Sequence, residues 1–218
     1  MKLIRSLTAL GLVLGATAFV PADAEAALIL RLSDGITPVE IQDGDLDDAN
    51  PAAGGVTFIG SVGVFVVNVT TGLSDPILGS ATEPHMDLNT VSVSSGAGTL
   101  TIELIDEDFV GAGTHSFAMN IGGTTGTTSS VTYNAYADGS LIDSLGPFGG
   151  PVFAATGGGS ATVGSPYELM QQVIITHTGA GVTSLDAELI APEPASLALL
   201  GLGLVGVGVG ARRRRNAA

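Results

Sequence analysis

The stretch VSVSSGAGTLTIELI, residues 91–105, decides the fold class. Apolar side chains alternate with Ser, Thr or Glu over Val91–Val93 and again over Leu100–Ile105, and Ser95-Gly96 between them is a turn signal. A period of two puts every second side chain on the same face of a strand. The stretch therefore predicts two β-strands joined by a turn, each with one face in a core.

Runs of the same kind recur along the chain. Besides those two, they are Leu28–Leu32, Val39–Ile41, Val56–Ile59, Val64–Val69, Phe117–Ile121, Val131–Tyr136, Val152–Ala155, Val173–Thr176 and Leu185–Ile190. Gly, Asp, Ser and Thr bound them, and the helix signal is weak throughout. This spacing predicts an all-β fold, namely an antiparallel β-sandwich or jelly roll of about ten strands. A barrel is the alternative, which the uneven segment lengths disfavour.

The amino end has the pattern of a secretory signal peptide. Lys2 and Arg5 precede the apolar stretch Leu7–Val20, which is shorter than the roughly 20 residues of a membrane-spanning helix. Small-residue cleavage sites follow, and signal peptidase could cut after Ala24 or after Ala26. An uncleaved amino-terminal anchor is the alternative.

We predict cleavage between Ala26 and Ala27, because the alternating strand pattern starts directly after this bond. The resulting division is a signal peptide over 1–26, an exported domain over 27–191 and a carboxyl-terminal segment over 192–218.

The carboxyl end contains a second apolar segment. Ala195–Ala211 has no charged residue, and a helix of this length spans about 25 Å, just short of a bilayer core of about 30 Å. Arginines fill positions 212–215 directly after it, namely Arg212, Arg213, Arg214 and Arg215. Basic flanks stay on the cytoplasmic side, so the body of the protein is expected outside. Hydrophobicity and charge alone suit a removable tail or a permanent single-pass anchor.

The order of elements in this tail resembles the PEP-CTERM sorting signal of Gram-negative bacteria. Pro192, Glu193 and Pro194 come first, followed by ASLALLG, a glycine-spaced apolar helix and the arginines. The resemblance implies recognition by exosortase, a multi-pass membrane enzyme of the transpeptidase type, acting at the Pro-Glu-Pro triplet. Membrane association is then transient, and the processed protein reaches the cell surface or the extracellular space. The exported part is similar to PEP-CTERM proteins of unassigned function that share stretches such as LRLSDG and FVVNVTTG.

The exported domain is strongly acidic. Residues 27–191 hold 18 of the 21 acidic residues but one basic residue, Arg31, which makes the formal net charge −17. Such a field repels phosphate backbones, so nucleic acid is excluded as a partner. The chain also has no cysteine, so an ordinary core must hold the fold together.

No motif predicts catalysis, and we expect a protein that is not an enzyme. G-x-S-x-G and H-E-x-x-H are absent, and His85, His115 and His177 are too far apart in sequence for a local metal motif. Carboxylate pairs such as Glu103 with Asp106, or Asp106 with Asp108, are the residues that a glycoside hydrolase would need. In so acidic a chain they arise readily by chance. A secreted polysaccharide hydrolase is therefore the less favoured alternative.

One acidic loop contains candidate calcium ligands. Asp43, Asp45 and Asp47 match the start of a calcium-binding loop, and Ca²⁺ prefers such hard oxygen ligands. Asp48 and Gly54 then stand where an EF-hand needs Gly and Glu, so an EF-hand is excluded. We expect either a looser calcium site or a solvated acidic loop, and no other cofactor.

We predict an exported surface or extracellular-matrix protein with a structural or interaction role. A glycan- or protein-binding module is the alternative, with extracellular polysaccharide as a candidate partner. Few aromatic side chains are available for stacking on sugars, because the chain has no Trp and its tyrosines are Tyr133, Tyr136 and Tyr167.

Overall fold

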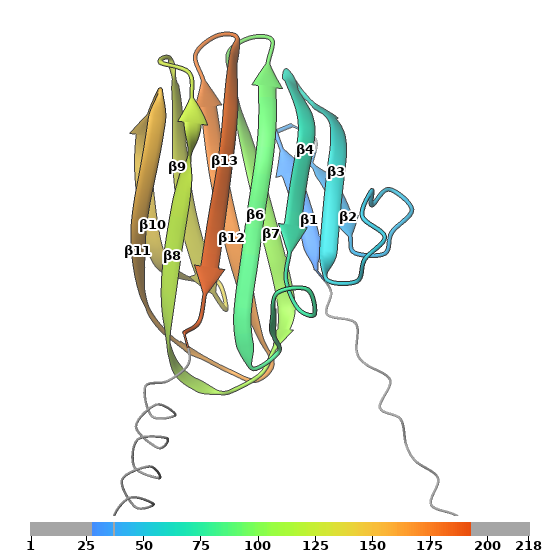
Figure 1. Ribbon diagram of the computed structural model, residues 1–218, viewed down its shortest axis with the longest axis vertical. Helices are drawn as coiled ribbons and strands as arrows, with labels where there is room; N and C mark the ends of the chain where they lie inside the picture. Colours follow the sequence, from blue (N-terminus) through green and yellow to red (C-terminus); the bar gives the residue numbers. More distant parts are fainter. Residues whose placement is uncertain (1–27, 37, 193–218) are drawn as a thin grey trace, which may run out of the picture.

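The computed structural model describes residues 28–36 and 38–192, and these residues form two packed β-sheets (Figure 1). The strands are β1 (Ile29–Ser33), β2 (Val39–Gln42), β3 (Gly55–Val62), β4 (Phe65–Leu73), β5 (Gly79–Ser80), β6 (Glu83–Ser94), β7 (Gly98–Phe109), β8 (Gly113–Thr125), β9 (Ser129–Ala137), β10 (Ser140–Gly149), β11 (Val152–Val163), β12 (Tyr167–His177) and β13 (Gly181–Ile190). Within these residues there is no helix that could cross a bilayer. The predicted signal peptide and the apolar tail lie outside the described residues.

The strands from β6 onward form a jelly roll. Sheet A has the order β10-β9-β12-β7-β1-β2, and sheet B has the order β11-β8-β13-β6-β4-β3, with β5 paired to β6. The pairs β9–β10, β8–β11, β7–β12 and β6–β13 are antiparallel and nested one outside the other, as in one long hairpin folded across two layers. The predicted all-β antiparallel sandwich is confirmed, in its jelly-roll form.

The first four strands widen both sheets. Strand β1 pairs with β7 and carries β2 at the edge of sheet A, and β4 pairs with β6 and carries β3 at the edge of sheet B. In Figure 1, β8, β13 and β6 of sheet B lie in front of the strands of sheet A. One face of each sheet therefore forms the core, and the other faces solvent.

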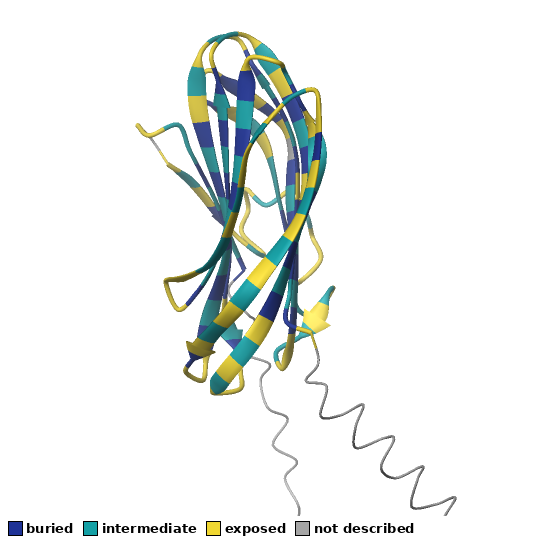
Figure 2. Ribbon diagram, turned by 90° about the vertical axis from the view of Figure 1, so that its left-hand side faces the viewer, coloured by how far each residue is buried: buried dark blue, intermediate teal, exposed yellow. Residues whose placement is uncertain are grey.

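The core lies where alternation predicted it. Figure 2 shows buried residues alternating with more exposed ones along the strands of both layers. On β7 the side chains of Leu100, Ile102 and Leu104 are fully buried, while Thr101 and Glu103 are not. The interior contains Leu30, Leu32, Val131, Tyr133, Val173 and Ile175 from sheet A, and Phe65, Val67, Met86, Leu88, Phe117, Met119, Ile121, Leu185 and Leu189 from sheet B. Burial of such apolar surface is the main stabilising contribution to the fold.

The structure adds a strand that alternation missed. Strand β10 contains Asp143, Gly146 and Pro147, which are typical of turns, and two register irregularities interrupt its pairing with β9. It is an edge strand, where such interruptions are tolerated.

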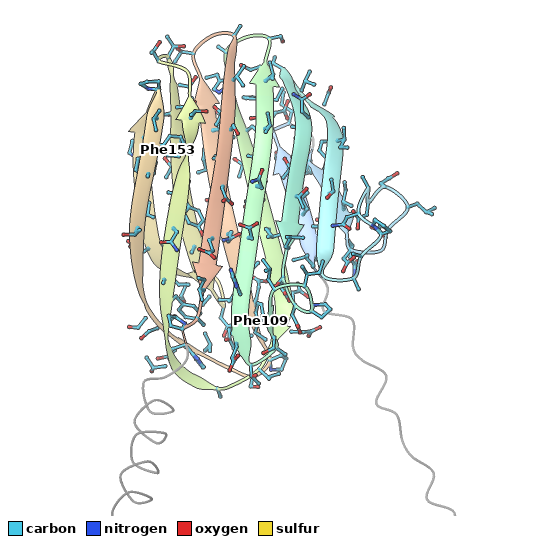
Figure 3. The ribbon with its side chains drawn as sticks, viewed as in Figure 1. Phe109 and Phe153 are labelled. Atoms are coloured by element: carbon cyan, nitrogen blue, oxygen red, sulfur yellow. The ribbon has the colours of Figure 1, made fainter. Side chains whose placement is uncertain are left out.

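Glycines in β11 let this strand approach β10. A Cβ atom at Gly159 would lie 2.6 Å from the carbonyl oxygen of Ile142. The side chain of Asp143 accepts a hydrogen bond from the Gly158 N–H (2.9 Å), which ties the two sheets together at this edge. Phe153, labelled in Figure 3, stacks on Phe148 at a ring separation of 5.2 Å. These glycines therefore allow two strands to approach closely. In the sequence, glycine indicated only turns.

Candidate functional site

A row of polar side chains crosses the whole outer face of sheet A. Each of the six strands contributes one residue at directly paired positions, in the order β2, β1, β7, β12, β9, β10. We call these six residues the polar row: Glu40, Arg31, Glu103, Gln172, Asn134 and Ser144. With strands about 4.8 Å apart, the polar row spans about 24 Å.

Hydrogen bonds link every neighbouring pair in the polar row. The Arg31 guanidinium donates to Glu40 Oε2 at 2.8 Å and to Glu103 Oε2 at 3.4 Å. Gln172 Nε2 donates to Glu103 Oε1 at 2.9 Å. Because each group restrains the next, the row is pre-organised.

The hydrogen bonds continue through the amide side chains of the polar row. Asn134 Nδ2 donates to Gln172 Oε1 (2.9 Å), and the Ser144 hydroxyl donates to Asn134 Oδ1 (2.7 Å). Each amide NH₂ has two donors, and these bonds use one donor of each. One N–H of Gln172, one N–H of Asn134 and carboxylate lone pairs of Glu40 and Glu103 remain for a ligand.

A row of apolar side chains runs beside the polar row, two residues away from it on β1, β7, β12 and β9 and three residues away on β10, where the register with β9 shifts. It consists of Ile29, Ile105, Met170, Tyr136 and Leu141, again at directly paired positions. Leu141 is 56% exposed, and Ile105 is covered by its neighbours, although it lies outside the interior core cluster. We call these five residues the apolar row. Tyr136 is the tyrosine on this outer face, whereas Tyr133 and Tyr167 are buried.

Carboxylates lie on the far side of the apolar row. Glu107 follows Ile105 by two residues on β7, and Glu168 precedes Met170 by two residues on β12. Partial burial raises the pKa of Glu168, and the nearby charges of Glu107 and Asp138 raise it further. The apolar row is thus flanked by carboxylates on both sides, because Glu103 belongs to the polar row.

A pocket of about 340 Å³ opens at one end of the sandwich, beside Phe109, which Figure 3 labels. Asp106 lines it and is 1% exposed, and the Ser74 hydroxyl donates to its Oδ2 at 2.5 Å. Burial raises the pKa of Asp106. Asp75 and Asp108 line the same pocket. Glu103 is instead bonded on the outer face of sheet A, so the carboxylates of Glu103 and Asp106 do not converge, whereas Asp106 and Asp108 share this pocket.

The outer face of sheet B carries an acidic cluster that no pattern in the sequence predicted. Asp87 on β6 lies directly opposite Glu188 on β13, and Asp186 follows on the same face. Burial raises the pKa of Asp87 to about 7, with further contributions from Asp186 and Glu188. His85 Nε2 donates to Glu188 Oε1 at 2.7 Å. The positions are about 100 residues apart in sequence, so only strand pairing brings them together.

The histidines do not form a site. His85 lies on sheet B, His115 contacts the Gly111 carbonyl oxygen at one end, and His177 is buried in the core. Ser94 Oγ is 2.5 Å from His177 Nδ1, but these residues are 2% and 1% exposed, so a substrate cannot reach this pair.

The acidic loop uses its carboxylates to hold its own backbone. Asp43 Oδ2 accepts from the Gly54 N–H at 2.5 Å, and Asp45 Oδ2 accepts from the Gln42 N–H at 3.2 Å. Asp47 belongs to the same loop, directly before Asp48 in the sequence. Across residues 28–36 and 38–192 no three carboxylate or imidazole groups are placed to hold a metal ion. Calcium binding by Asp43, Asp45 and Asp47 stays a prediction.

The fold and tail together define an exported jelly-roll protein. The PEP-CTERM protein-sorting motif matches residues 191–215, which marks the chain as an exosortase substrate. Those residues include Pro192, Glu193, Pro194 and the four arginines, so the predicted resemblance is confirmed. No curated protein matches the sequence.

Several solved structures are similar to the chain at low identity. A structure of TmCBM61 in complex with beta-1,4-galactotriose is 11% identical, with 61% of this chain and 92% of that chain covered and a TM-score of 0.35. The PA14 sugar-binding domain from an RTX adhesin is 11% identical, with 75% and 90% covered and a TM-score of 0.32. Carbohydrate-binding modules from the beta-sandwich superfamily are 12% identical, with 71% and 66% covered and a TM-score of 0.34. At such TM-scores the likeness says nothing about a ligand.

Proposed function

We propose that this protein is a surface or extracellular-matrix binding module, without catalytic activity, that holds an extended polysaccharide on the outer face of sheet A. Exosortase-dependent processing would release the domain from its membrane-associated precursor. The observation that carries the proposal is the continuous polar row beside the apolar row.

The two rows match the two kinds of surface on a sugar. Sugar hydroxyl groups need hydrogen-bond donors and acceptors. The unused N–H groups of Gln172 and Asn134 and the lone pairs of Glu103 supply them. The C–H face of a ring packs on apolar or aromatic side chains, which Tyr136 and Met170 supply. A polar row about 24 Å long suits an extended chain rather than a single small molecule.

Pre-organisation favours binding over a purely structural role. Six polar side chains are already ordered by mutual hydrogen bonds, so a ligand would not have to immobilise them. A polar face that served solubility alone would need no continuous bonding across all six strands.

The test is binding of soluble polysaccharides to residues 27–191 by affinity electrophoresis and isothermal titration calorimetry. In the double variant Asn134→Ala/Gln172→Ala, we expect loss of about 1–3 kcal/mol, or roughly 5- to 150-fold in Kd, since each hydrogen bond contributes about 0.5–1.5 kcal/mol. The control is Asn89→Ala, an exposed amide on sheet B. Equal binding by wild type and double variant, at unchanged thermal stability, would refute the proposal.

A further inference from the structure

The charge around the apolar row is unbalanced. On β7, Ile105 stands between Glu103 and Glu107, and on β12, Met170 stands between Glu168 and Gln172. Alternate residues of one strand face are about 6.7 Å apart. A ligand lying along the apolar row is therefore within reach of carboxylates along both of its edges.

Among the described residues, burial and the carboxylates of Glu107, Asp138 and Glu103 raise the pKa of Glu168, and they outweigh the charge of Arg31, which lowers it. Arg31 is the one Lys or Arg in this part of the chain, and it is bound to Glu40 and Glu103 on the other edge. No ion pair among residues 28–36 and 38–192 includes Glu107 or Glu168. Asp138, close to Glu168, is held by the backbone N–H groups of Gly164 and Glu168. A cationic group beside Glu168 would relieve the repulsion that the charge of Arg31 offsets only in part.

We propose that the polysaccharide bound on sheet A carries free amino groups, as a polymer of amino sugars lacking at least part of its N-acetyl groups does. This inference rests on the proposed function and names its ligand class. The C–H faces of the sugar rings would pack on Met170 and Tyr136, while ammonium groups meet Glu168, Glu107 or Glu103. Ammonium–carboxylate hydrogen bonds are roughly twice as strong as neutral ones.

The same arrangement disfavours other polymers. An acidic polysaccharide would add negative charge beside a domain of net charge −17, and a neutral polymer would bring no positive charge to Glu107 and Glu168. Charge complementarity therefore selects the free amine.

The experiment compares a glucosamine hexamer with the N-acetylglucosamine hexamer, a neutral glucan hexamer and polygalacturonate, by calorimetry with residues 27–191 at pH 6 and low salt. We expect at least tenfold tighter binding of the glucosamine hexamer, and a difference that shrinks as salt is added. Glu168→Gln should reduce that preference severalfold. Glu83→Gln, the same change on an exposed residue of β6 in sheet B, should leave it unchanged.

The outcomes separate the two proposals. Equal affinity for the glucosamine and N-acetylglucosamine hexamers, or preference for the neutral glucan, would overturn the free-amine inference and leave polysaccharide binding intact. An equal loss in Glu168→Gln and Glu83→Gln would also overturn it, because attraction would then be general rather than local. Absence of binding to every oligomer and polymer would overturn both.

Discussion

Ser94 and His177, from opposite sheets, meet in the interior of the sandwich, where Ser94 Oγ and His177 Nδ1 lie 2.5 Å apart. The other imidazole nitrogen, Nε2, is 2.8 Å from Thr183 Oγ1, which is itself bonded to Thr125 at 2.6 Å. The imidazole also packs against the Phe65 ring at 5.4 Å. A polar bridge thus crosses the interior between the two sheets, with the imidazole of His177 at its centre.

This bridge predicts loss of stability in acid. Burial lowers the pKa of His177, so the folded protein takes up this proton less readily than the unfolded chain does. The stabilisation is therefore present above the unfolded pKa of about 6.5 and declines as the pH falls below it. We expect His177→Gln to be destabilised by about 1–3 kcal/mol at pH 7.5, and less so at pH 5. Thermal unfolding of both proteins across this range is the measurement, and a gap independent of pH would contradict it.

The carboxylates on sheet B predict the opposite trend. The pKa of Asp87 is raised to about 7, so its contribution to stability is greatest in acid and is lost as the pH rises through 7. Because Asp87 lies directly opposite Glu188, Asp87→Asn should raise the thermal midpoint at pH 8, by on the order of 2 °C. At pH 4 the gain should vanish. Glu83→Gln is the control, and a gain of equal size in both variants would point to net charge instead.

The approach of β11 to β10 predicts a sharp glycine requirement. In Gly159→Ala the new methyl group would lie 2.6 Å from the backbone oxygen of Ile142, so the edge must open. We expect a loss of about 1–3 kcal/mol in chemical denaturation. Gly149→Ala on the neighbouring β10 meets nothing within 4 Å and should be near neutral. Similar losses in both variants would show that the contact with Ile142 does not set the requirement.

The acidic loop predicts a calcium effect. If Asp43, Asp45 and Asp47 bind Ca²⁺, added calcium should raise the thermal midpoint relative to chelator, by an amount set by the ratio of free calcium to Kd. The Asp43→Asn/Asp45→Asn/Asp47→Asn variant should lose this shift. Equal shifts in both proteins, or none in wild type, would exclude the site.

The tail predicts a processed mature protein. In cells with a functional exosortase, the intact mass should correspond to a chain that starts at Ala27 and lacks everything beyond the Pro192-Glu193-Pro194 triplet. Alanine at all three positions should leave the full-length precursor in the membrane. Neutral residues in place of Arg212–Arg215 should remove the translocation stop, so that the protein leaves the membrane unprocessed. Retention of these arginines in wild-type protein would mean that the tail is a permanent anchor.

Alternation in the sequence predicted most strands but missed the edge strand β10. Every predicted run lies in a strand or overlaps one, because alternation directly reports a half-buried strand. Strand β10 was missed because its Gly and Pro residues, accommodated at an edge, look like turn signals. Among the candidate residues, the tail motif was recognisable because its elements are contiguous. Asp87 and Glu188 were not, since pairing across two distant strands joins them.

The amino-acid sequence by itself therefore determined most of the strands, the acidic exported domain without cysteine and the sorting tail. These are local or compositional properties, which can be predicted without knowing which strands pair. The tertiary structure alone decided the nested pairing of the jelly roll and the row from Glu40 to Ser144. Residues 31, 40, 103, 134, 144 and 172 become neighbours only through long-range strand register, and a slip of one residue would turn each affected side chain to the other face of its sheet.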